Sequence, residues 1–276
     1  MKRTFRKVLT VLLAAVLLVS LAAVGLQQLN YRRGDTDYAE AETLTGLPPE
    51  VTAAPLPKKE PAAPKAETET PAPEAEEEID PEAELLAALE QMDLEALRRT
   101  NGDVLGWILI PGTEVNYPIV QRGDNDYYLD HTWKGESSSV GAIFLDYRNA
   151  ADFSDGNTLI YGHNMKNRSM FGSLKYYLND GHWEEHPAVY LVNDAGVHRY
   201  DIYAVYEAAV DSVTYELNFA DDAAKTEFIH HGIRRSVVDT DIVPTAKDGI
   251  ITLSTCTGVG YATRWVVQAA LITPDA

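Results

Sequence analysis

The chain has 276 residues and is strongly acidic, with 42 Asp and Glu against 23 Lys and Arg and a formal net charge of −19. The charge divides as +6 for residues 1–34, −10 for residues 35–80 and, by difference, −15 for residues 81–276. A C-terminal part this acidic is a poor partner for nucleic acid and for anionic lipid headgroups, and it is long enough for one well-buried core.

The N-terminal segment has the pattern of a membrane anchor. Four Lys and Arg residues within positions 1–7 precede residues 8–26, none of which is charged. As a helix, this apolar run spans roughly 28 Å, about the thickness of the hydrocarbon layer of a bilayer. We predict a single transmembrane anchor over residues 8–31, with residues 1–7 in the cytoplasm and the remainder exported. The alternative is a cleaved signal peptide, because residues 20–22 form a small-x-small site.

The next segment, residues 32–79, is predicted to be a disordered stalk. Residues 35–80 contain eight of the fourteen prolines, many alanines, and thirteen acidic residues against three lysines. Such a composition offers too little apolar surface to offset the entropy of an ordered chain. The stalk would separate a catalytic domain, residues 80–276, from the membrane.

Residues 80–276 have the texture of a mainly β domain. Residues 80–101 read as an amphipathic helix that is interrupted near Asp93, and residues 219–240 read as a second helix. Between and after them lie short runs rich in Val, Ile, Tyr and Thr, which predict about eight strands of a closed antiparallel barrel or a sandwich. These runs are GWILIPG, VNYPIVQ, GAIFLD, NTLIYGH, AVYLVN, HRYDIYAVYEA, GIITLSTC and RWVVQAALI.

The chain has one cysteine, Cys256, at the end of the seventh predicted strand. Outside the membrane a lone thiol cannot form an intramolecular disulfide, so it is either a nucleophile or a small buried hydrophobic residue. A short connection to the last strand places Arg264 near it, and His163 ends another predicted strand. A histidine or arginine near a cysteine stabilises a nucleophilic thiolate. Spacing alone does not prove that the three side chains converge, and six other histidines are equally eligible.

A second motif suggests different chemistry. His182 and His186 in HWEEH match the H-x-x-E-H pattern of an inverted zinc peptidase site. Pro187 follows at once and disfavours a helical conformation at His186, and no third ligand is evident. We therefore expect His186 to lie at the start of a strand and predict no metal or other cofactor. A non-catalytic surface module with a buried, unreactive Cys256 is a further alternative.

Five ordered blocks resemble the class B sortases, membrane-anchored cysteine transpeptidases of Gram-positive bacteria. The blocks are GWILIPGTEVNYPIVQ, DNDYYLDHTW, GAIFLDYRN, NTLIYGHNMKNRSMFGSLKYY, and TLSTC followed by Arg264. The resemblance implies an eight-stranded barrel with N-terminal helices and a helix between strands six and seven. It also implies that Cys256 is the nucleophile, His163 the acid/base and Arg264 the residue at the oxyanion.

The resemblance further implies the substrates. A sorting signal similar to Asn-Pro-x-Thr would be cleaved after threonine, and the thioacyl enzyme would be resolved by an amine of a peptidoglycan precursor or, alternatively, of a pilin lysine. It places Asn125, Leu129, Tyr215 and Ser254 along the cleft for the signal, although each could instead be an ordinary turn, strand or packing residue. Thr257 and Gly258 follow the cysteine where some class B members carry acidic residues, which leaves the acceptor side undefined.

Overall fold

A computed structural model describes residues 2–53, 55, 80–258, 260 and 262–272. Its helices are α1 (Lys2–Thr45), α2 (Pro49–Ala53), α3 (Pro81–Glu90), α4 (Leu94–Arg98), α5 (His182–Glu185) and α6 (Asp222–Arg235). Its strands are β1 (Val104–Leu109), β2 (Asn116–Val120), β3 (Ile143–Leu145), β4 (Asn157–Tyr161), β5 (Ala188–Asn193), β6 (Gly196–Ala209), β7 (Gly249–Cys256) and β8 (Thr263–Leu271). Short 3-10 helices are η1 (Tyr127–Leu129), η2 (Leu174–Leu178) and η3 (Val213–Tyr215).

The eight strands form a closed barrel in the order β1-β2-β3-β4-β7-β8-β6-β5. Most pairs are antiparallel, but β2 pairs with β3, and β4 with β7, in parallel. Closure leaves no strand edge unpaired, and the alternating apolar residues fill the interior. The predicted barrel with N-terminal helices and a helix between strands six and seven is confirmed, since α6 lies between β6 and β7.

The helices that precede the barrel begin where the sequence predicts them. Asp80 caps α3 by accepting from the backbone N–H of Glu82, and Pro81 occupies the first turn, where its missing N–H costs nothing. Asp93 caps α4 by accepting from the backbone N–H of Ala96. The predicted helix over residues 80–101 is therefore divided at Asp93, as expected. Buried Leu85 and Leu89 attach α3 to the core.

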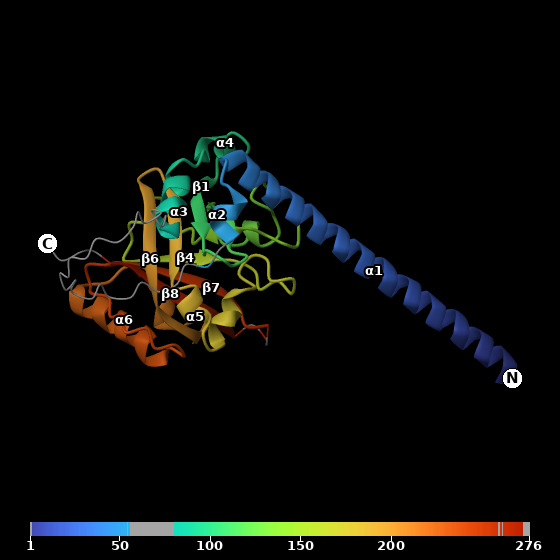
Figure 1. The fold of residues 1–276 in the computed structure, drawn as a ribbon. Coiled ribbons are helices and arrows are strands. Elements are labelled where there is room, and N and C mark those ends of the chain that lie inside the picture. The colour runs from blue at the N-terminus through green and yellow to red at the C-terminus, as the bar shows by residue number, and fades with distance from the viewer. Residues whose placement is uncertain (1, 54, 56–79, 259, 261, 273–276) are drawn as a thin grey trace, which may run out of the picture.

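The N-terminal helix α1 leaves the barrel as one long rod that carries the N-terminus far from the domain (Figure 1). Within the described part of the chain it is the one helix that is long and apolar enough to cross a membrane. This property concerns length and composition alone, and a signal sequence shares it.

The predicted stalk is wrong for its described part, residues 32–53, which is folded. Residues up to Thr45 continue α1, and α2 follows at once. Gly34, Tyr38, Ala41 and Thr45 are buried at helical spacing, and they attach the helix to the barrel. Composition averaged over residues 35–80 concealed this stripe, because the prolines begin only at Pro48. Residues 54 and 56–79 lie outside the described part of the chain.

Candidate active site

The barrel topology brings three strand ends to one edge. β4 and β7 run parallel with Tyr161 paired to Ser254, so the residues that follow these two positions leave the barrel side by side. His163 lies two residues beyond Tyr161, and Cys256 lies two residues beyond Ser254. β8 begins at the same edge, because β7 and β8 are antiparallel and pair Cys256 with Arg264.

The pairing of Cys256 with Arg264 also decides which way their side chains point. Residues directly opposite each other on antiparallel strands project from the same face, with Cβ atoms about 4.5–5.5 Å apart. The alternation along β7 puts Ser254 on that face as well. The thiol, the guanidinium and the serine hydroxyl are therefore neighbours on one side of the sheet.

An open cavity of about 190 Å³ lies at this edge. It is lined by Asn125, Leu129, Phe144, Tyr161, Gly162, His163, Ser254, Thr255, Cys256 and Arg264. Six of the seven site residues predicted from the sequence are among these. The seventh, Tyr215, lines an adjoining cavity of about 320 Å³, which shares Asn125, Tyr161, Ser254 and Arg264 with the first.

The imidazole of His163 is held by the backbone. Its Nε2 lies 2.6 Å from the carbonyl oxygen of Leu129. Because a carbonyl oxygen can only accept, this contact assigns a proton to Nε2 and leaves Nδ1 as the second ring nitrogen. The side-chain amide of the next residue, Asn164, donates to the carbonyl oxygen of Cys256 over 2.7 Å. The two strand ends that carry the imidazole and the thiol are thereby tied together.

Tyr215 and Ser254 both line the adjoining cavity, and their hydroxyl oxygens lie 3.1 Å apart. Burial raises the pKa of the Tyr215 phenol, while the bond to Ser254 and the positive charge of Arg264 act against this rise. Cys256 also raises that pKa. Tyr215 is thus close enough to both Cys256 and Arg264 for electrostatic interaction with their side chains. The Arg264 guanidinium also donates to the carbonyl oxygen of Thr263 over 2.9 Å.

A buried carboxylate, Asp146, lines the adjoining cavity and binds Asn125 and Tyr161, which line both cavities. Its Oδ2 accepts from the Asn125 amide at 3.1 Å, the Tyr161 hydroxyl at 3.0 Å and the Arg148 guanidinium at 2.8 Å. Its Oδ1 accepts from the backbone N–H and Nε of Arg148. Burial by itself raises the pKa of Asp146, but the bonds from Arg148 and Tyr161 outweigh it and hold the pKa below its ordinary value.

This network fixes the orientation of Asn125. Its Oδ1 accepts from the backbone N–H of Tyr147 at 2.9 Å, and one N–H of its amide is used by Asp146. Asn125 therefore has one further amide N–H to offer to a ligand. The roles of Asp146, Arg148 and Tyr161 were not predicted from the sequence. The signal for the first two was an acid and a base directly after the apolar run IFL.

The sortase domain family matches residues 108–272. Sortase B of Listeria monocytogenes is 40% identical over 183 residues, which cover 66% of this chain and 74% of that protein. Sortase B of Staphylococcus aureus is 33% identical over 180 residues, which cover 64% and 74%. This chain belongs to the class B sortases.

Solved sortase B structures share the barrel. A Staphylococcus aureus sortase B–substrate complex has a TM-score of 0.62 and 32% identity, with 66% of this chain and 85% of that chain covered. Bacillus anthracis sortase B in complex with AAEK1 has a TM-score of 0.66 and 32% identity, with 89% of this chain and 99% of that chain covered. Membership of this family makes the protein an enzyme, a cysteine transpeptidase, and it overturns the zinc peptidase and the non-catalytic module.

The two histidines of the zinc-like motif belong to the packing of this sortase. His182 begins α5, and His186 lies between α5 and β5, as expected for a residue just before a strand. Their ring centroids are 4.5 Å apart, and His186 Nδ1 lies 2.8 Å from the carbonyl oxygen of Pro111. Burial, together with His186, lowers the pKa of His182 to about 4. Among the described residues, no group of three or more His, Cys, Asp and Glu could hold a metal ion.

Proposed function

We propose that this sortase cleaves an Asn-Pro-x-Thr-like sorting signal after threonine and joins the resulting thioacyl intermediate to an amine of a peptidoglycan precursor. The observation that carries the proposal is the shared cavity of Cys256, His163 and Arg264. A thiol, an imidazole and a guanidinium at one rim supply the nucleophile, the proton donor and the oxyanion ligand that acyl transfer needs. The amino-acid sequence proposed for the signal, Asn-Pro-x-Thr, comes from the family resemblance.

In the first half-reaction, the Cys256 thiolate attacks the carbonyl carbon of the threonine in the sorting signal. His163 then protonates the leaving amine and the peptide bond breaks. Because Leu129 holds the proton on Nε2, Nδ1 is the nitrogen that we assign to this transfer. The second half-reaction runs in reverse: the incoming amine attacks the thioester and gives one proton to His163, the new amide bond forms, and the bond to sulfur breaks to release the Cys256 thiolate.

Arg264 is assigned to the carbonyl oxygen of the scissile bond. The assignment is supported by its place opposite Cys256 on the neighbouring strand, because negative charge develops on the oxygen bonded to the carbon that the thiolate attacks. A planar guanidinium can hold that oxygen and a second substrate oxygen in a fixed fork geometry, which an ammonium group does not provide.

The remaining cavity residues are assigned to the sorting signal. Asn125 offers one amide N–H, the Tyr215–Ser254 pair offers hydroxyls, and Leu129, which is 43% exposed, offers apolar surface. An extended peptide with a polar residue, a proline and a threonine needs this mixture of donors and apolar contact. We assign no metal or other cofactor to the reaction.

We infer that α1 anchors the enzyme with its N-terminus inside the cell and the barrel outside. The support is the apolar run of α1 and the four cations that precede it. This topology would place the barrel beside surface proteins that carry a sorting signal and beside membrane-attached peptidoglycan precursors. A pilin lysine is the second candidate for the acceptor amine, because the cavity residues assigned here do not distinguish one primary amine from another.

The test uses the full chain in lipid nanodiscs and a fluorogenic Asn-Pro-x-Thr peptide. Cys256→Ala and Cys256→Ser should both abolish cleavage, and His163→Ala should lower kcat by about 10² or more. The matched control is His182→Ala, which should cleave at close to the normal rate. Retention of most activity in Cys256→Ala would refute the proposed nucleophile.

Two further experiments test the acceptor amine and the orientation in the membrane. Supplying a soluble peptidoglycan-stem amine or a pilin-lysine peptide in competition shows which acceptor forms the new amide. The orientation is tested with a membrane-impermeant thiol reagent on intact cells, because Cys256 is the only thiol in the sequence. Labelling only after the cells are broken would contradict an external barrel.

A further inference from the structure

The helix that carries the predicted anchor also holds a loop of the active site. Residues 129–141, here called the 129–141 loop, run from the last residue of η1 to two residues before β3. The indole N–H of fully buried Trp133 donates to the carbonyl oxygen of Asp37 on α1 over 2.9 Å. The ammonium group of Lys134 pairs with the carboxylates of Asp37 and Glu40. The middle of the loop is thus fastened to α1 by a hydrogen bond from Trp133 and by ion pairs from Lys134.

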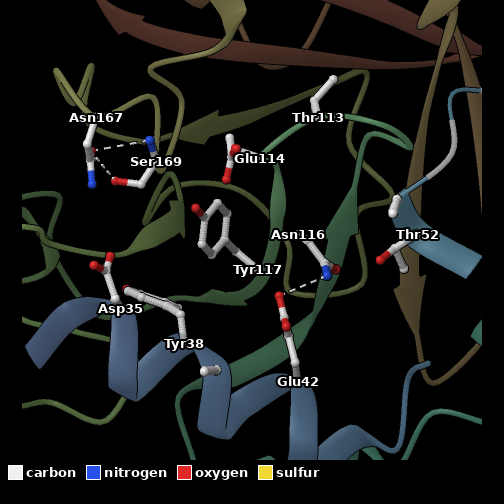
Figure 2. A pocket seen from close by; sticks show the side chains of 12 residues that line it. Asp35, Tyr38, Glu42, Thr52, Thr113, Glu114, Asn116, Tyr117, Asn167 and Ser169 are labelled. Carbon is white, nitrogen blue, oxygen red and sulfur yellow. Dashed lines mark hydrogen bonds between the residues drawn. The ribbon is translucent and has the colours of Figure 1, made fainter. Parts of the chain in front are cut away.

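Tyr38 fastens the far end of the same loop. Its buried hydroxyl donates to the carbonyl oxygen of Gly141 over 2.7 Å. Its ring packs edge to face on Tyr117 of β2, with centroids 5.0 Å apart. Figure 2 shows Tyr38 projecting from α1 toward Tyr117, with Glu42 one turn further along and bonded to Asn116. Burial raises the pKa of Tyr38 well above its ordinary value, so the hydroxyl keeps its proton and remains a donor.

Both ends of the 129–141 loop touch the imidazole of His163. At one end, the Leu129 carbonyl oxygen lies 2.6 Å from its Nε2. At the other end, Gly141 has a positive φ of 65°, and a Cβ at this position would lie 2.7 Å from His163 Cδ2. Glycine therefore lets the backbone lie directly against the ring. A shift of Gly141 moves the surface on which the imidazole rests.

We propose that Tyr38 is a positioning residue for His163 and that the anchor helix is thereby coupled to catalysis. The hydroxyl of Tyr38 holds the Gly141 carbonyl, Gly141 sets one side of the imidazole, and Leu129 sets its Nε2. This inference rests on the proposed acid/base role of His163. It differs from a purely structural role, because the loss of one hydroxyl should change the chemistry more than the stability.

The experiment compares two hydroxyl deletions in the full chain in nanodiscs. Tyr38→Phe removes the bond to Gly141 and keeps the ring on Tyr117. The matched control, Tyr177→Phe, removes another buried tyrosine hydroxyl that donates to a backbone carbonyl over 2.7 Å, that of His186. Trp133 and Lys134 still hold α1 in the Tyr38 variant, so both proteins should fold.

The expected result is a drop in kcat of about 10-fold or more for Tyr38→Phe, with KM within about twofold, because small misplacements of a catalytic group are costly. The limb of the pH–rate profile that reports His163 should move, and Tyr177→Phe should show neither change. NMR of isotope-labelled histidine, with the His163 signal assigned from His163→Asn, should show that ring shifted and titrating differently in Tyr38→Phe alone.

The outcomes separate the inference from the proposed function. Equal rates and an unchanged His163 resonance in both tyrosine variants would overturn the coupling. A shifted resonance with a normal rate would also overturn it, since the ring would then move without consequence for catalysis. If His163→Ala keeps full activity, the proposed acid/base role fails, and that result does not depend on Tyr38.

Discussion

Asp146 gives the sharpest quantitative prediction, because replacement by asparagine keeps its shape and changes only its charge and its acceptors. Both carboxylate oxygens are occupied by donors, from Arg148 on one side and from Arg148, Asn125 and Tyr161 on the other. In Asp146→Asn an amide NH2 replaces one oxygen. Whichever side it faces, at least two donors lose their acceptor and meet another donor.

The expected decrease in the free energy of unfolding follows from the burial of Asp146 and Arg148. Removing one member of a buried ion pair costs about 3–5 kcal/mol, and a hydrogen bond to a charged group contributes about 1.5–3 kcal/mol. The Asp146 side chain is fully buried, but the Arg148 side chain is 44% exposed, so water takes over part of its solvation. We therefore expect Asp146→Asn to decrease the free energy of unfolding by about 2–4 kcal/mol, which lowers Tm by about 5–15 °C in a domain of this size.

The pH dependence adds a second signature. Because the pKa of Asp146 is lowered in the folded state, its stabilisation is present above the unfolded pKa of about 3.9 and is lost as the pH falls through the lower folded value. The difference in Tm between the wild type and Asp146→Asn should therefore be full at pH 7 and should shrink below about pH 4.

The assay is thermal unfolding of both proteins from pH 3 to pH 8, together with peptide cleavage at pH 7. Asn125 and Tyr161 share Asp146 as their acceptor, so kcat/KM should fall about tenfold, the equivalent of roughly one hydrogen bond. Asp152→Asn is the control, because this exposed carboxylate accepts from the backbone N–H of Ser154 in its own loop and does not line either cavity. A variant of Asp146 that melts with the wild type and keeps its kcat/KM would contradict this account of the network.

Three further predictions concern other parts of the molecule. Arg264→Ala should lose about 10²–10³ in kcat with little change in Tm, and Arg264→Lys should recover only part of the rate; full recovery would make the residue a simple point charge. A chain that starts at Asp80 should melt at least about 4 °C below one that starts at Tyr31, because it lacks the buried Tyr38, worth roughly 2 kcal/mol; calorimetry giving equal Tm values would show that α1 adds no stability. The pKa of His182 is lowered to about 4, so the unfolded chain takes up this proton before the folded protein does, and the free energy of unfolding should fall as the pH drops from about 6.5 to about 4. Denaturant titrations of His182→Phe should show a weaker dependence of the unfolding free energy on pH. An unchanged pH dependence would assign the effect to another group.

The residues proposed to be catalytic could be assigned their roles from the sequence only through the resemblance. The order of the chain showed a thiol at one strand end, an imidazole at another and an arginine at the start of a third strand. The short connection between the last two strands predicted that Arg264 lies near Cys256, but the sequence did not show that β4 and β7 are neighbours, because they are separated by β5, β6 and α6. Once that pairing exists, the register alone brings His163, Cys256 and Arg264 to one edge.

The division between sequence and tertiary structure follows the range of the interactions. Short runs rich in Val, Ile, Tyr and Thr predicted the eight strands, and the amphipathic pattern of residues 80–101 predicted the helices before them, because these signals act within a few residues. The folding of residues 32–53, the Asp146 network and the link from Tyr38 to Gly141 were decided only by the tertiary structure. The last of these joins residues 103 positions apart, and a local pattern carries no information on which distant backbone carbonyl a buried hydroxyl will meet.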